Sequence, residues 1–344
     1  EWGNDRIQVF DTSGNWKATW GSPGTSLSQF DNPTQLTFDA RGYLLVADAN
    51  NARVLMLVTG NGRYLAQING DSHATFSAID GLALLPAGLL AVADYDAHQV
   101  EQFATDGKHG FEYGPELYGN ALPLGAVSDV AFDATSQMYV ADTGNNRVVV
   151  VMLPGNVPQV LGGPGTDPGK FFLPTGISLD PAGNIYVVDS SNHRIQKFDS
   201  SLNFVTMWGA LGTSQGQFGA PYGIYATATR VYVTDQADRK VQVYSSTGTF
   251  LFEFGSQGAG NGQFENLRRI TGDASGFIYV TADDRVQKFT AEGVYVTSFG
   301  TSGSGNGQLL SPSGIAVGSD GKVYVADSGN DRVQVFAPVL EEIP

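Results

Sequence analysis

Short apolar runs separated by turn residues pattern the whole chain. Segments of five or six residues rich in Val, Ile, Tyr and Phe recur along it, and clusters of Gly, Pro, Asn, Asp and Ser lie between them. Runs of this length and composition are typical of β-strands, and the apolar spacing of an amphipathic helix has little support in the sequence. The pattern therefore predicts an all-β fold.

The strands belong to a repeat that occurs seven times. Its best-preserved part is an apolar strand that ends in aspartate, followed by a turn and a second strand, as in NIYVVDSSNHRIQKF from Asn184. The repeat aspartates are Asp48, Asp94, Asp142, Asp189, Asp235 and Asp327, with Ala282 in the sixth place. They are 46, 48, 47, 46 and then 92 residues apart, the last being twice 46. This spacing is typical of the blades of a β-propeller, each built from four strands.

Four strands, named a to d in chain order, fit within each period. In the fourth repeat they are expected to begin at Thr175, Ile185, Arg194 and Phe204, and a Gly-rich crossover from Ala210 leads to the next repeat. The b strands are apolar at nearly every position, which predicts sheets packed on both faces.

The pattern P-x-G-I-x-x-D-x-x-G-x-I-Y-V-x-D-x-x-N-x-R-V-Q-x-F resembles the NHL repeat over essentially the whole chain. It is cleanest from Pro174 to Phe198 and from Pro312 to Phe336. The resemblance implies a β-propeller, commonly of six blades, a fold used by enzymes and by protein- or RNA-binding modules alike.

The number of repeats favours seven blades, with six as the alternative. Six complete four-strand units run from about Pro33 to Phe299, and the a, b and c strands of a seventh follow. The first residues supply a c strand from Asp5 and a d strand from Asn15. We therefore expect residues 1–344 to form a single propeller domain whose seventh blade is shared by about residues 1–20 and 312–336, so that strands from both ends close the ring.

One c strand is redundant in this arrangement. Residues 3–10 (GNDRIQVF) and 329–336 (GNDRVQVF) are nearly identical, and only one of them can occupy the c position of the last blade. The spare strand is expected either to lie outside as a fifth strand or to pair with another molecule, in which case the chain self-associates by strand exchange.

The start of each inner a strand, at the channel mouth, is the expected ligand site. The candidate residues, three that replace a repeat glycine and three neighbours of such positions, are Gln35, Asp129 and Arg269, and Asp80, Tyr222 and Arg268. Carboxylates facing guanidinium groups can bind a small polar ligand, with a cation on one side or a carboxylate on the other. The alternative is that these charges are solvated or pair with one another.

A second set of basic residues is interpreted as structural. Its members follow the repeat aspartate by five residues, or stand in the equivalent place of a turn: Arg53, Arg147, Arg194 and Arg332, with Gln99, Lys240 and Arg285. The regular distance predicts a local hydrogen-bond network of aspartate, asparagine and arginine that ties the b-to-c turn.

No cofactor is indicated by the residues. The histidines are His73, His98, His109 and His193. A zinc site of three histidines, which the resemblance to peptide-amidating lyases of this fold suggests, requires convergence at about 2 Å from the metal, and we favour exposed histidines instead. Calcium and zinc stay as options, although the acidic turn near Ala93 lacks the spacing of an EF-hand loop.

Charge and composition narrow the partners. The chain has 34 acidic and 19 basic residues, a formal charge of −15, and such a surface repels nucleic acid. It has no cysteine, and no apolar run approaches the roughly 18 residues that membrane insertion requires. These features favour an extracellular, periplasmic or cell-surface location, with the cytoplasm as the alternative.

The sequence thus predicts a non-catalytic propeller scaffold that binds a protein, a glycan or a small polar ligand. The alternative is a metal-dependent lyase or hydrolase with its site at the channel mouth, similar to peptide-amidating lyases, and this alternative rests on fold analogy.

Overall fold

The structure, a computed structural model, describes residues 122–133, 135, 137–152, 158–273, 275–303, 307–310 and 312, and elsewhere Phe30, His98 and the strands given below. The chain forms two compact units, residues 1–79, 105–109 and 271–344, and residues 80–104 and 110–270. Strands and two single-turn 3-10 helices make up the regular structure of the described residues, without an α-helix. The all-β prediction is confirmed.

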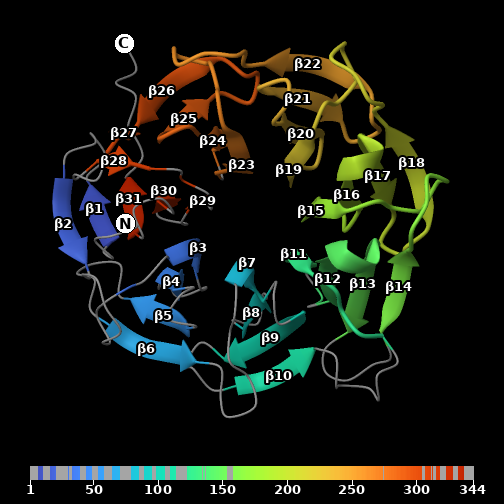
Figure 1. The fold of residues 1–344 in the computed structure, drawn as a ribbon, viewed down its shortest axis with the longest axis horizontal. Helices are drawn as coiled ribbons and strands as arrows, with labels where there is room; N and C mark the ends of the chain where they lie inside the picture. Colours follow the sequence, from blue (N-terminus) through green and yellow to red (C-terminus); the bar gives the residue numbers. More distant parts are fainter. Residues whose placement is uncertain are drawn as a thin grey trace. The chain divides into compact units, whose positions relative to one another are not determined.

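Four-stranded sheets build the second unit (Figure 1). Taken sheet by sheet in the order of the chain, the strands are β7 (Ile79–Leu84), β8 (Leu89–Asp94), β9 (Gln99–Ala104) and β10 (His109–Tyr113); β11 (Val127–Phe132), β12 (Gln137–Asp142), β13 (Arg147–Met152) and β14 (Gln159–Gly162); β15 (Pro174–Leu179), β16 (Ile185–Asp189), β17 (Arg194–Phe198) and β18 (Phe204–Trp208); and β19 (Pro221–Ala226), β20 (Arg230–Asp235), β21 (Lys240–Ser245) and β22 (Phe250–Phe254). The last three sheets are antiparallel throughout.

The first unit also contains four-stranded sheets, together with a two-stranded and a five-stranded sheet. Its strands are β3 (Pro33–Phe38), β4 (Leu44–Asp48), β5 (Arg53–Leu57) and β6 (Tyr64–Asn69); β24 (Ile278–Ala282), β25 (Arg285–Phe289) and β26 (Tyr295–Phe299); the short pair β27 (Thr301–Ser302) and β28 (Gln308–Leu309); and β29 (Ile315–Val317), β30 (Val323–Asp327), β31 (Arg332–Phe336), β1 (Ile7–Phe10) and β2 (Trp16–Trp20). Strands β24–β26 continue the sheet that begins with β23 (Leu267–Gly272), inside which the division between the two units falls.

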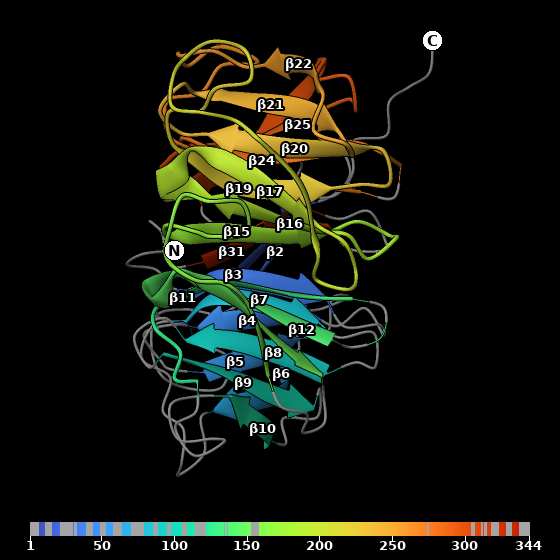
Figure 2. The same cartoon turned by 90° about the vertical axis from the view of Figure 1, so that its right-hand side faces the viewer.

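The strands of the fourth repeat lie where the sequence predicts them. β15 begins one residue earlier than expected, at Pro174, and β16, β17 and β18 begin at the expected residues. β15, β16 and β17 are neighbours in both views of the ribbon (Figures 1 and 2). All five residues of β16 are buried, as the apolar b-strand pattern predicts.

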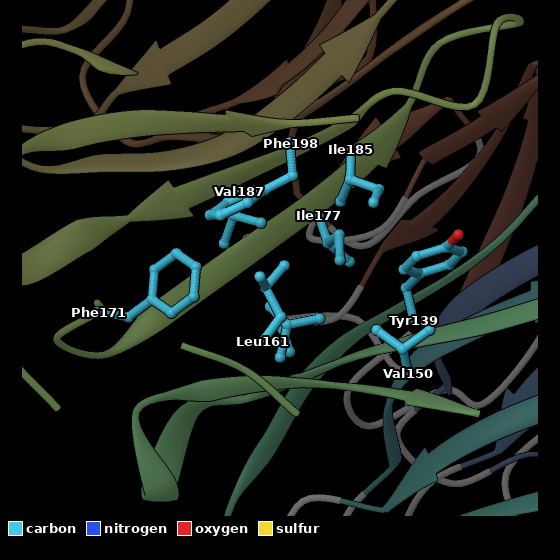
Figure 3. Packing of buried hydrophobic residues seen from close by; sticks show 10 residues of the cluster. Tyr139, Val150, Leu161, Phe171, Ile177, Ile185, Val187 and Phe198 are labelled. Atoms are coloured by element: carbon cyan, nitrogen blue, oxygen red, sulfur yellow. The ribbon is translucent and has the colours of Figure 1, made fainter. Parts of the chain in front are cut away.

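The core lies between successive sheets. In the cluster that Figure 3 shows, Tyr139 and Val150 of one sheet meet Ile177 and Val187 of the next. Phe171, which comes from the crossover between the two sheets, belongs to the same cluster and is fully buried. Each sheet therefore contributes apolar side chains to the core that it shares with its neighbour.

A large apolar side chain from each of four described crossovers, aromatic in three of them, is buried in the core, a feature that the sequence analysis missed. Phe218 is fully buried, and Gly209, at φ 105°, faces its ring. A Cβ atom at Gly209 would lie 2.7 Å from that ring, so only glycine fits there. The same position is held in other crossovers by Phe171, Phe264 and Leu309, all buried. Their spacing of 45 to 47 residues was the available signal.

A buried carboxylate ends four of the described b strands, at Asp48, Asp142, Asp189 and Asp235, and accepts hydrogen bonds from the surrounding loops where its contacts are described. Asp189 is fully buried and accepts hydrogen bonds from the backbone N–H of Phe172 (2.7 Å), from Asn192 Nδ2 and from Arg194 Nε (2.7 Å). Asp142 is equally buried and accepts from Arg147 Nε at 2.6 Å. These contacts confirm the predicted network of aspartate, asparagine and arginine.

The arginine of the network also binds the crossover. Arg194 donates to the carbonyls of Thr166, Asp167 and Lys170, at 2.6, 3.0 and 2.8 Å. Next to it, Gln196 of the same strand accepts from Gly169 N–H and donates to the Lys170 carbonyl. The guanidinium group thus donates hydrogen bonds to both the turn and the crossover, in agreement with the structural interpretation of the basic residues.

The fifth repeat departs from this network. Asp238 stands where the fourth repeat has Asn192, and it brings a second carboxylate beside Asp235. Burial raises the pKa of Asp238 and the charge of Asp235 raises it further, whereas Lys240, 3.6 Å away, acts in the opposite direction. The side chain of Asp238 is 11% exposed, and its Oδ2 atom accepts no hydrogen bond from the described residues.

Both ends of the chain contribute strands to one sheet of the first unit, in the order β2-β1-β31-β30-β29. β31 occupies the third place, and β1 lies beside it in parallel. The sheet has five strands, but the spare c strand, β1, takes the fourth place and does not lie outside as the fifth. The strand from Asn15, which the sequence placed fourth, instead lies fifth as β2, because β1 takes the fourth place.

We expect replacement of Phe218 by alanine to lower the free energy of unfolding by about 3 to 5 kcal/mol, because it empties a fully buried aromatic site. Chemical denaturation monitored by tryptophan fluorescence measures the change. Leu211→Ala in the same crossover is the control, since Leu211 is 68% exposed and its truncation should change stability by less than about 0.5 kcal/mol. Equal effects of the two variants would contradict the stabilising role of the buried Phe218 side chain.

We expect Asp238→Asn to stabilise the protein at pH 7 by about 1 kcal/mol, because the amide can donate to Asp235 as Asn192 donates to Asp189. A raised carboxyl pKa means that the protonated form favours folding, so the aspartate destabilises above its folded pKa. The gain should therefore shrink as pH falls through the raised pKa of Asp238 towards the unfolded value of about 4. Denaturation midpoints across pH 3.5–8 measure it. The reciprocal Asn192→Asp should destabilise most at neutral pH, and a pH-independent difference in either variant would refute this explanation.

Candidate functional site

The predicted ligand residues lie on the first, inner strand of their sheets. Asp129 is on β11, Tyr222 on β19, and Arg268 and Arg269 on β23, all within the second unit. Asp80 lies on β7 and Gln35 on β3, and the side chains of these two lie outside the described residues.

Glycine at the repeat position allows one inner strand to approach the next. A Cβ atom on Gly176 would lie 2.7 Å from the carbonyl oxygen of Tyr222, and one on Gly223 would lie 3.0 Å from that of Arg268. Side-chain hydroxyls join the same strands, because Thr175 donates to the carbonyl of Tyr222, and Thr234 of β20 accepts from the N–H of Gly223 and donates to the carbonyl of Arg268. The backbones around the candidate residues are therefore fixed by direct contact.

Asp129 replaces this glycine and makes a contact of its own. Its Oδ2 atom accepts a hydrogen bond from the backbone N–H of Ile177, on the next inner strand, at 3.1 Å. Its Oδ1 atom accepts from the backbone N–H of Val130 at 3.0 Å. The carboxylate is thus held by the backbone of two strands, and its side chain is 18% exposed.

Arg269 reaches the same carboxylate from β23. Its Nη1 atom lies 3.6 Å from Asp129 Oδ2, and its guanidinium carbon lies 5.0 Å from the centre of the Tyr222 ring. We call Asp129, Tyr222 and Arg269 the inner-strand cluster. Asp129 and Arg269 pair with each other, which was the alternative that the sequence left open for these charges.

The geometry of the inner-strand cluster would allow another carboxylate to replace Asp129 as the anion that pairs with Arg269. A charge-assisted N–H···O⁻ hydrogen bond is about 2.7–2.9 Å long, and an ideal carboxylate binds arginine through two such bonds. The 3.6 Å separation of Arg269 and Asp129 is longer, and both side chains keep access to solvent. Arg268, next in sequence, is exposed. An incoming carboxylate could therefore pair with Arg269, while Arg268 adds a positive charge on the same strand.

The described histidines occupy turn positions. His98 and His193 adopt left-handed backbone conformations, with φ of 60° and 54°, and Asn146 and Arg239 hold the same place in other turns at φ 58° and 54°. His98 is exposed, as expected, whereas His193 is half-buried. Among the residues whose placement is described, no group of three or more histidine, aspartate or glutamate side chains is arranged to hold a metal ion.

His73 and the side chain of His109 lie outside the described residues.

The helices of the described part of the chain include none with the length and apolar character that crossing a membrane requires.

Comparison with solved structures identifies proteins of similar fold. Streptogramin B lyase is 15% identical to this chain, with a TM-score of 0.69, and the match covers 86% of this chain and 90% of that one. Selenomethionine-substituted virginiamycin B lyase from Staphylococcus aureus is 14% identical, with a TM-score of 0.67 and coverage of 87% and 92%. Kuenenia stuttgartiensis hydrazine synthase is 13% identical, with a TM-score of 0.69 and coverage of 91% and 97%. Identities this low show the fold alone.

Comparison with protein families gives a more specific result. No curated protein sequence matches the chain. Residues 173–198 and 309–336 match the family model of the NHL repeat, and these are the segments where the repeat pattern is cleanest. The chain therefore contains NHL repeats in these two segments, and its four-stranded antiparallel sheets and structural neighbours show a β-propeller fold.

Proposed function

We propose that this protein is a non-catalytic binding propeller whose inner-strand cluster takes a small ligand bearing a carboxylate. The observation that carries the proposal is the placement of Arg269, whose guanidinium group lies over the Tyr222 ring and 3.6 Å from Asp129. The ligand carboxylate would replace Asp129 as the partner of Arg269. The proposal needs no cofactor.

Preorganisation supports this exchange. Stacking on Tyr222 restricts the guanidinium group of Arg269, so ligand binding has less side-chain entropy to remove. Asp129 keeps its hydrogen bond from Ile177 when it gives up the arginine, and its carboxylate is therefore not left without a donor. Both features lower the cost of replacing one carboxylate by another.

The scaffold that we propose for this site is one domain of seven blades spanning residues 1–344. Seven copies of the repeat support the blade count, and the sheet that joins β1 and β2 to β29–β31 supports closure by strands from both ends. The acidic, cysteine-free composition supports a location outside the cytoplasm, where the partner is a protein, a glycan or a small polar molecule and nucleic acid is disfavoured by charge.

Isothermal titration with acetate, succinate, glutamate and citrate, and with methylamine as the cationic comparison, tests the site. We expect one or more of the carboxylates to bind and Arg269→Gln to weaken that binding at least about tenfold, because a charge-assisted hydrogen bond contributes about 1.5–3 kcal/mol. Asp129→Asn should strengthen it, since the competing anion is removed. Arg239→Gln, at a partly exposed pair with Glu265, is the matched control and should leave affinity unchanged.

The absence of carboxylate binding, or equal affinity of the wild type and Arg269→Gln, would overturn the proposed site. If methylamine alone bound and Asp129→Asn abolished its binding, Asp129 would be the ligand-binding group and the carboxylate assignment would be wrong.

Metal analysis of the purified protein separates binding from the lyase or hydrolase alternative. We expect less than about 0.1 zinc or calcium ion per chain after purification without chelators, since a structural or catalytic site holds about one ion per chain. Elemental analysis by mass spectrometry measures the ratio. A stoichiometric metal, retained through gel filtration and lost on mutation of histidine or aspartate, would support the metal-dependent enzyme instead.

A further inference from the structure

The two terminal copies of the c strand meet in one sheet. Residues 3–10 and 329–336 differ only at Ile7 and Val333, and β1 and β31 lie side by side with Gln8 opposite Gln334 and Val9 opposite Val335. Equivalent residues of two nearly identical strands are thus in register, in parallel. In the three sheets of β11–β22, the strand beside the c strand is its antiparallel d strand.

The hairpin of β1 and β2 has the register of a complete c–d pair. Ile7 pairs with Trp20 and Phe10 with Trp16, with a register shift between Val9 and Phe10. In the fourth repeat Ile195 pairs with Trp208 and Phe198 with Phe204, with the shift at the equivalent place. The hairpin is therefore built for the third and fourth places of a sheet, and it lies in the fourth and fifth.

β31 occupies the third place in the register of the other repeats. Asp327 pairs with Arg332 and Val323 with Phe336, as Asp189 pairs with Arg194 in the fourth repeat. Because the two sequences are so similar, β1 can adopt the same register against β30. The sheet would then have the regular order β29-β30-β1-β2, and β31 would be released.

We propose that two copies of this chain exchange their β31 strands to form a dimer. Domain exchange is normally slow because a strand must leave before its replacement arrives, which exposes a sheet edge. Here the chain's own β1–β2 hairpin covers β30 while β31 is away. The incoming β31 of the second copy then restores the third place with the same backbone pairs. Each strand pairing of the monomer is regained in the dimer.

Cysteine cross-linking across β30 and β31 tests the exchange, and the absence of native cysteine makes each disulfide unambiguous. Ala326 and Val333 are direct partners in the register, and Val188 and Ile195 are the equivalent pair of the fourth repeat. The full chain would carry Ala326→Cys with Val333→Cys, or Val188→Cys with Ile195→Cys as the control. Two copies with different affinity tags would be incubated together at high concentration and then oxidised.

We expect disulfide-linked dimers carrying both tags from the β30–β31 pair, and intramolecular disulfides alone from the control pair. Intramolecular disulfides alone from both pairs at every concentration would overturn the proposal. Dimers from both pairs would also overturn it, since they would show general unfolding or aggregation. Circular dichroism of each variant before oxidation verifies that the chain is folded.

Val9→Pro in the β30–β31 cysteine background tests the role of the hairpin, because proline removes one backbone donor from β1. We expect the fraction of mixed dimer formed in a fixed time to fall about fivefold to tenfold, the effect of one lost hydrogen bond on the covering state. An unchanged or larger fraction would show that β31 leaves without help from the hairpin, and the mechanism would be wrong.

Discussion

The buried aspartate at the end of the b strand, described as Asp48, Asp142, Asp189 and Asp235, is the contact on which the sheets that contain it depend. A carboxylate taken out of water destabilises a fold strongly unless charged and polar donors surround it. Asp189 meets this condition with a backbone N–H, an asparagine amide and a guanidinium group that come from three different segments. The turn after the b strand, the start of the c strand and the end of the crossover are thereby tied to one point.

That point sets where the inner strand begins. Phe172, whose N–H binds Asp189, lies two residues before β15, so the carboxylate fixes the position from which the inner strand starts. Glycine then brings neighbouring inner strands into backbone contact, and hydroxyl groups hold them there. A side chain on an inner strand therefore has a fixed origin. This rigidity allows Asp129 and Arg269, on strands of different sheets, to face each other over Tyr222.

Features set by local spacing could be predicted from the sequence, and features set by the arrangement of sheets could not. The distance of five residues from Asp189 to Arg194 already implies their contact, because both lie at one hairpin turn. Asp129 and Arg269 are 140 positions apart, and their pairing depends on the positions of four inner strands relative to one another. The repeat pattern named both residues as departures from glycine without indicating that they meet. Likewise, the duplicated c strand was visible, but its parallel pairing with β31 was not, since strand direction leaves no mark on apolar alternation.

Comparison of the repeats with one another separates two kinds of departure. Asp238 replaces an asparagine and leaves a carboxylate oxygen without a hydrogen bond from the described residues, next to a second acid. Asp129 replaces a glycine, but there the backbone of Ile177 supplies a donor, so the new charge is stabilised. A departure that destabilises the turn changes how stability depends on pH. A departure of the second kind introduces a charge that the scaffold holds in place, partly exposed and paired with a second such residue. It keeps the fold intact and adds chemistry that the other described inner strands lack. On this argument, the ligand site of a repeat protein is to be sought where the repeat is broken and the break is structurally compensated, which in this chain is the inner-strand cluster.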